Sequence, residues 1–171
     1  MIRNCRNMKL NVRPAYVLFA HKYYYEGPCR MAGGEAIEPG FDSIVSGALM
    51  RSTMETIKKV MPDCVNLMEP VSVEVTDDWE VKEEYFDELL KDQDKVDVYL
   101  ATNTFGADMV FNEFALRCKK PICVQPGIWG PVKSGMLFSL GVDPICEMTW
   151  DDTVKRLVAL YAKKVIRESN L

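Results

Sequence analysis

The sequence predicts an α/β fold in which a mostly parallel sheet is doubly wound, with helices on both of its faces. Compact apolar runs such as AYVLFA (15–20) and VDVYLATN (96–103) are typical of strands that are buried on both faces. Segments with the helical spacing of apolar residues lie between these runs. Strands that alternate with helices in this way indicate a parallel sheet that is covered on both sides.

The first half of the chain divides at its glycines, prolines and changes of apolar spacing. The expected elements are a strand at 15–20, an amphipathic helix from 41 to about 61, a strand at 64–70, an edge strand or extended loop at 71–76, and a helix at 77–93. Asp42 or Ser43 can cap the first helix, and Pro62 ends it. The apolar face of this helix is expected to include Ile44 and Leu49.

The second half continues the alternation. Its expected elements are a strand at 96–103, a helix at 106–120, a strand at 121–127, a weaker strand at 144–149, and a helix from 150 to about 169. Thr149 and Asp152 have the spacing of a capping box at the start of the last helix. The residues that this helix is expected to bury are Val154, Leu157, Val158, Tyr161 and Val165.

Length and composition limit the classes of protein that the chain can belong to. With 171 residues we expect one domain at 13–171, after a disordered N-terminal extension at 1–12. A net charge of -4 argues against a nucleic-acid binder, and no apolar run is long enough for a membrane span. Six cysteines without a secretory signal or a C-x-x-C pair favour free thiols in the cytoplasm over disulfides or a zinc site.

Polar loops follow three of the predicted strands, and in a parallel sheet these loops meet at one edge. His21 follows the first strand, NTFGAD follows the central strand, and QPGIWGP follows the next. Ligands bind at this edge, near the point where the strand order reverses. His21 is the only histidine, so a metal site with several histidines is excluded, and we interpret His21 as a loop anchor or a substrate contact.

The remaining loop features leave alternatives open. The glycines of MAGGEA match neither dinucleotide nor P-loop motifs, so they form a turn or, less readily, hold a phosphate. The three tyrosines after Lys22 either pack their own loop or contact a sugar or another subunit. Thr104 can cap a helix and also bind a hydroxyl-rich ligand. No nucleophile elbow, catalytic triad or metal-ligand cluster is recognisable.

Three stretches carry a resemblance to a known family: RPAYVLFAHKYYY, VDVYLATNTFGADMVFNEFALRCKKPICVQPG and TWDDTVKRLVALYAKKVIRESN. Together they resemble the N-terminal domain of the L-fucose and L-arabinose isomerase superfamily. The resemblance runs from about Arg13 to Asn170. It implies an aldose–ketose isomerase that uses a divalent metal, often Mn²⁺, held by two carboxylates and a histidine in later domains. It therefore implies neither catalytic residues nor metal ligands in this chain, which alone would be inactive.

The resemblance also implies how this domain would act. In the family the N-terminal domain packs in a homo-oligomer and contributes contacts to the sugar site of a neighbouring subunit. The residues that this implies as substrate contacts are His21, Lys22, Tyr23, Thr104 and Phe105. The alternative interpretation is a free-standing module of flavodoxin-like topology that binds a small ligand and has no enzyme activity. The long Gly/Pro-rich loop and the missing catalytic set favour that alternative.

Overall fold

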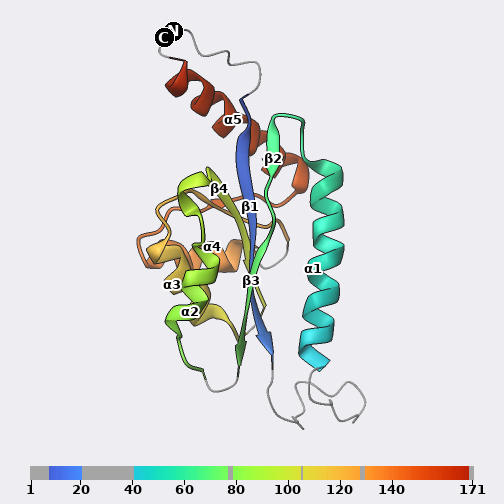
Figure 1. Ribbon diagram of the computed structural model, residues 1–171, viewed down its shortest axis with the longest axis vertical. Helices are drawn as coiled ribbons and strands as arrows, with labels where there is room; N and C mark the ends of the chain where they lie inside the picture. Colours follow the sequence, from blue (N-terminus) through green and yellow to red (C-terminus); the bar gives the residue numbers. More distant parts are fainter. Residues whose placement is uncertain (1–7, 21–40, 77–78, 105, 128–129, 170–171) are drawn as a thin grey trace.

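The fold is a single parallel sheet between two layers of helices (Figure 1). The computed structural model describes residues 8–20, 41–76, 79–104, 106–127 and 130–169. The elements are β1 (Leu10–Ala20), α1 (Phe41–Val60), β2 (Val65–Leu67), β3 (Val71–Thr76), α2 (Glu83–Leu89), a 3-10 helix (Gln93–Lys95), β4 (Val98–Asn103), α3 (Asp108–Arg117), β5 (Ile122–Val124), α4 (Gly130–Ser139), β6 (Ile145–Cys146) and α5 (Trp150–Glu168).

All described strand pairs are parallel, and the strand order reverses once. The order is β2-β1-β4-β5-β6, and β3 continues the line of β2 along the same side of β1. The chain therefore builds outward from β1 in one direction through β2 and β3, then crosses to β4 and builds the other way. This is the doubly wound, flavodoxin-like arrangement that the sequence predicts. Its reversal point lies between β1 and β4, which pair from Val12 to Val17 of β1.

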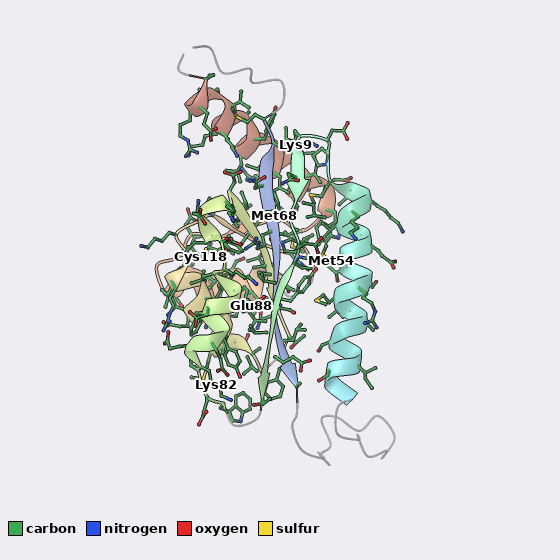
Figure 2. The ribbon with its side chains drawn as sticks, in the orientation of Figure 1. Lys9, Met54, Met68, Lys82, Glu88 and Cys118 are labelled. Carbon is green, nitrogen blue, oxygen red and sulfur yellow. The ribbon has the colours of Figure 1, made fainter. Side chains whose placement is uncertain are left out.

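The two faces of the sheet are covered by different helices. One core cluster joins α2, α3 and α4 to the side chains of Ala15, Val17, Tyr99 and Ala101. The other joins α1 and α5 to the alternate residues of the same strands, such as Val12 and Leu100. Figure 2 shows Met54 on the α1 side and Cys118 on the side of α2 and α3. The alternation of strand side chains between two apolar layers explains why the strands are almost wholly apolar.

Several predicted boundaries are wrong, each for a local reason. β1 begins at Leu10, so residues 10–12, assigned above to a disordered extension, pair with β2 and lie in the sheet. α1 already begins at Phe41, so Ser43 lies inside the helix and is not its cap. Its Oγ instead donates a hydrogen bond to Glu74 on β3 at 3.2 Å.

The helix predicted at 77–93 is mostly wrong, because among its described residues the α-helix covers only Glu83–Leu89, and Gln93 begins a separate 3-10 helix. Trp79 has a left-handed backbone (φ 57°), and so does Asp92 (φ 51°), which excludes both from a continuous helix. The sequence prediction contains no helix at Gly130–Ser139, where the structure has α4. The segment at 71–76 is a strand at the edge of the sheet, the first of the two alternatives.

The last helix confirms its predicted start and corrects part of its predicted face. Thr149 Oγ1 accepts a hydrogen bond from the Asp152 amide at 3.2 Å, which is the N-cap half of a capping box, and donates one to Asp152 Oδ2 at 2.8 Å. Leu157 is fully buried, but Val158 is 40% exposed and does not belong to the core. Within the described residues, no helix combines the length and apolar character needed to cross a membrane.

Candidate functional site

A large pocket among the described residues lies where the strand order reverses. It has a volume of about 810 Å³ and opens between α1, the sheet and the start of α4. Strand β1 contributes Tyr16 and Leu18, and the end of β4 contributes Thr102, Asn103 and Thr104. Asp108 of α3, the residues that follow β5 and the beginning of α5 also belong to the lining. The pocket therefore occupies the place where open α/β sheets bind their ligands.

One end of this pocket is polar and is organised by Lys133 on α4. Its Nζ donates hydrogen bonds to Thr102 Oγ1 at 3.1 Å and to the carbonyl oxygen of Asn103. Burial lowers the pKa of Lys133, and the nearby Asp108 carboxylate opposes that change. Asp108 is itself bound by Asn103, whose Nδ2 donates to Asp108 Oδ1 at 2.8 Å. The lysine thus joins α4 to the end of the central strand with its charge inside the pocket wall.

Three buried residues of the pocket carry polar atoms that make no hydrogen bond. They are the Tyr16 hydroxyl, Nε2 of Gln125 and Oδ1 of Asn103. Burial raises the pKa of the Tyr16 hydroxyl, and the proximity of Gln125 lowers it by less, although no hydrogen bond of ordinary length joins them. Leaving such groups unsatisfied costs free energy, so they are expected to have partners when the pocket is filled.

The rest of the lining is both hydroxylated and apolar. Ser52, Thr53 and Thr56 contribute hydroxyl groups from α1, along one wall. The apolar lining residues are Leu18, Leu49, Val132, Met136 and Trp150. A wall of this mixed kind can bind a small molecule through its hydroxyl groups on one side and its C–H surface on the other.

Thr104 is the one predicted site residue that the structure describes. It lines the pocket, but its Oγ1 accepts a hydrogen bond from the Phe19 amide, and its own amide donates to the carbonyl of Val17 at 3.0 Å. The hydroxyl therefore helps to hold the loop after β4 against β1. The other predicted contacts, His21, Lys22, Tyr23 and Phe105, lie outside the described residues.

Sequence reasoning missed Tyr16 and Lys133, and it placed Gln125 at the ligand edge only as part of the loop QPGIWGP. Gln125 directly follows the apolar run ICV, so its position at a strand end was visible in the sequence. Tyr16 was hidden because it lies inside a run that is apolar throughout. No sequence feature pointed to Lys133 as a pocket residue, since no helix was expected at its position.

The described cysteines do not form a metal site. Cys118 packs with the α2 and α3 cluster and Cys123 with the α1 and α5 cluster, so the sheet separates these two thiols. Burial raises the pKa of Cys118, and it raises the pKa of Cys123 to about 12, so both stay protonated at neutral pH. Among the described residues, no group of three His, Cys, Asp or Glu side chains is placed to hold an ion.

Comparison with known proteins leaves the function to be argued from this geometry. No protein-family model matches the chain. Neither the curated proteins nor the solved structures include a significant match.

Proposed function

We propose that this chain binds a small, hydroxyl-rich ligand in the pocket between β1, β4, α1 and α4. The observation that carries the proposal is the set of buried, unpaired polar atoms on Tyr16, Asn103 and Gln125, all of which line one pocket. A hydroxyl group both donates and accepts hydrogen bonds, so a polyol or sugar can satisfy donors and acceptors of this kind together. The pocket volume of about 810 Å³ lies within the range of roughly 300–1,000 Å³ that is usual for ligand sites.

A blocking substitution on α1 tests this proposal. Thr53→Phe would place a ring in the pocket, whereas Lys59→Phe puts the same residue on the exposed side of the same helix. We expect a panel of aldoses, ketoses and polyols to contain at least one ligand that raises the Tm of the unchanged chain and of Lys59→Phe, but not of Thr53→Phe. A panel in which no member binds, or a ligand that binds Thr53→Phe equally well, would contradict the proposal.

A second candidate gives this pocket a place in an enzyme. The chain would be the substrate-capping and oligomer-forming N-terminal domain of a fucose/arabinose-isomerase-like aldose–ketose isomerase, working in the cytoplasm. The pocket at the predicted ligand edge favours it, and Thr104 lies in the pocket wall. Asp108 is the only carboxylate among the described lining residues, so the proton transfer and the metal, Mn²⁺ by resemblance, would come from later domains.

The isomerase role requires a separate experiment. We expect the purified chain with added Mn²⁺ to leave L-fucose and L-arabinose unchanged, and the polypeptide isolated from its source to be much heavier than 19.5 kDa. Isomerisation by the chain alone would show that its catalytic residues are not elsewhere. A native mass of 19.5 kDa would instead favour the free-standing binding module.

A further inference from the structure

We infer that the polar end of the pocket binds an anionic group of the ligand, a phosphate or a carboxylate, with Lys133 as its counter-charge. This inference rests on the proposed function, because it names the class of small ligand that the pocket takes. It narrows the class of ligand from hydroxyl-rich molecules in general to those that also carry a negative charge.

The hydrogen bonds that hold the Lys133 ammonium both go to neutral groups. Its two hydrogen-bond acceptors are the Thr102 hydroxyl and the carbonyl of Asn103. An ammonium group has three protons to donate, so one donor direction remains for a ligand. Among the described residues, no carboxylate lies within ion-pair distance of its Nζ. A partly buried charge of this kind is stabilised when an anion joins it.

The Asp108 carboxylate does not take the place of an anionic partner for Lys133. Its Oδ1 accepts the hydrogen bond of Asn103 Nδ2 at 2.8 Å, and it is the first residue of α3, where the helix dipole favours a negative charge. Asp108 is therefore already stabilised by its own helix. The charge of Lys133 remains the one that a ligand can neutralise.

Gln125 lies in the wall of the same pocket and carries an unpaired donor. Its side chain is only 9% exposed, and its Nε2 has no hydrogen-bond partner. The Tyr16 hydroxyl, which is also unpaired, lines the same pocket from β1. An ammonium, an amide and a hydroxyl donor together can serve several oxygen atoms of one anionic group.

The start of α4 adds a favourable field. Gly130 and Val132 line the pocket at the first turn of this ten-residue helix. The Gly130 amide already donates to the carbonyl of Gly127, and Pro131 has no amide hydrogen, so neither of these residues offers an amide donor to a ligand. The positive end of the helix dipole nevertheless faces the same region as the lysine.

Isothermal titration calorimetry of the full chain with matched pairs of probes tests the inference. One pair is D-fructose 6-phosphate and D-fructose, and the other is D-gluconate and D-sorbitol, with inorganic phosphate as a fragment. We expect the anionic member of at least one pair to bind about tenfold tighter or more than its neutral partner. The pair that shows the difference identifies phosphate or carboxylate as the group that is bound.

Substitutions assign the effect to Lys133. We expect Lys133→Gln to abolish the preference for the anion and Lys133→Arg to keep most of it. Lys163→Gln removes the same charge from the exposed side of α5 and is expected to change nothing. A Lys133→Gln variant that keeps the full preference would overturn the inference.

Two further outcomes separate the inference from the proposed function. If neutral and anionic probes bind equally, the inference is wrong and the proposed function stands; if no probe binds, both are wrong. If the Lys133→Gln variant fails to fold, the inference is tested by the salt dependence of probe binding to the unchanged chain. Added NaCl is expected to weaken binding of the anionic probe and not of its neutral partner, and equal behaviour of the two would reject the inference.

Discussion

The two faces of the sheet use the same strands in different ways. On the side of α2, α3 and α4, packing is continuous, and Tyr99 meets Phe114 edge to face with ring centroids 5.3 Å apart. On the side of α1 and α5, packing is confined to the first halves of the strands, around Leu100 and Ile57. The second halves of β1 and β4 line the pocket instead.

The difference follows from α1. The end of this helix carries Ile57, which is fully buried against the sheet, whereas Ile44 and Leu49 in its first half are 72% and 53% exposed. The predicted apolar face of α1 is therefore wrong over its first half. A helix that packs along only part of its length leaves volume beside the sheet, and that volume is the candidate site. Substitutions on the packed face should therefore mainly lower the free energy of unfolding, and those on the pocket face should mainly lower the affinity for a ligand.

The largest expected effect comes from the packed face. Phe114→Ala should lower the free energy of unfolding by about 3–5 kcal/mol, because it removes a fully buried ring. Leu49→Ala, at the pocket wall, should change it by no more than about 0.5 kcal/mol. Urea denaturation of both variants measures the two changes in the free energy of unfolding. Similar losses at the two positions would show that the α1 side is packed as tightly as the other.

The next effect concerns the loop after β4. Gly106 has a left-handed backbone (φ 95°), and a Cβ there would lie 2.9 Å from Cγ of Phe19, whose ring stacks on Trp79. Gly106→Ala should therefore cost about 2–3 kcal/mol. Gly135→Ala on α4, where a Cβ meets nothing within 4 Å, should instead stabilise the chain by about 0.5–1 kcal/mol. Thermal and urea denaturation of the two variants should give opposite signs.

A smaller effect is expected at Thr104, where sequence and structure suggest different roles. Thr104→Val keeps the shape but removes the acceptor of the Phe19 amide hydrogen bond, and should cost about 1–3 kcal/mol. If the hydroxyl serves the backbone, the affinity for a ligand of the folded variant should be unchanged. A loss of affinity with unchanged stability would support the predicted substrate contact.

The smallest stability effect is expected for a matched pair of tyrosines, one on each face. Tyr16 and Tyr99 are both buried with unpaired hydroxyls, so Tyr16→Phe and Tyr99→Phe should each change stability at neutral pH by less than about 1 kcal/mol. Only Tyr16→Phe should weaken ligand binding, because only Tyr16 lines the pocket. Calorimetry of both variants checks this, and equal losses of affinity would remove Tyr16 from the site.

Tyr99 also predicts how the stability of the fold changes at alkaline pH. Burial raises its pKa from 10.0 to about 12, so the folded chain keeps the proton that the unfolded chain loses. Its stabilising contribution is present below pH 10 and is lost as the pH rises from about 10 to 12. Over that range Tyr99→Phe should lose less stability than the unchanged chain in parallel urea titrations. An identical alkaline loss in both would contradict a protonated Tyr99 in the folded state.

The sequence predicts the strands well and one helix not at all. Strands buried on both faces, such as Val98–Asn103, leave a contiguous apolar run that few other structures produce. Helix α4 begins GPVKSG, and glycine and serine there suggest a loop, so tertiary packing overrides local propensity. Trp79 shows the opposite error, because an acidic and aromatic segment that favours a helix contains a left-handed residue.

The candidate site was located from the sequence, but its residues mostly were not. The rule for parallel sheets places the ligand edge after the strands, and the pocket lies there. Which side of the sheet opens depends on how far α1 packs, and that is a property of the assembled fold. Tyr16 and Lys133 reach the same pocket from β1 and α4, a meeting that sequence spacing does not encode.

The interruption of the strand beside β1 affects how the protein behaves at high concentration. β2 and β3 are separated by Met68–Pro70, and Pro70 has no amide hydrogen to offer another chain. At the opposite border of the sheet, β6 contributes only two residues. Among the described strands, the border beside β1 is divided into runs of three residues in β2 and six in β3, and the opposite border has two, so each stretch that another copy of the chain could extend is short.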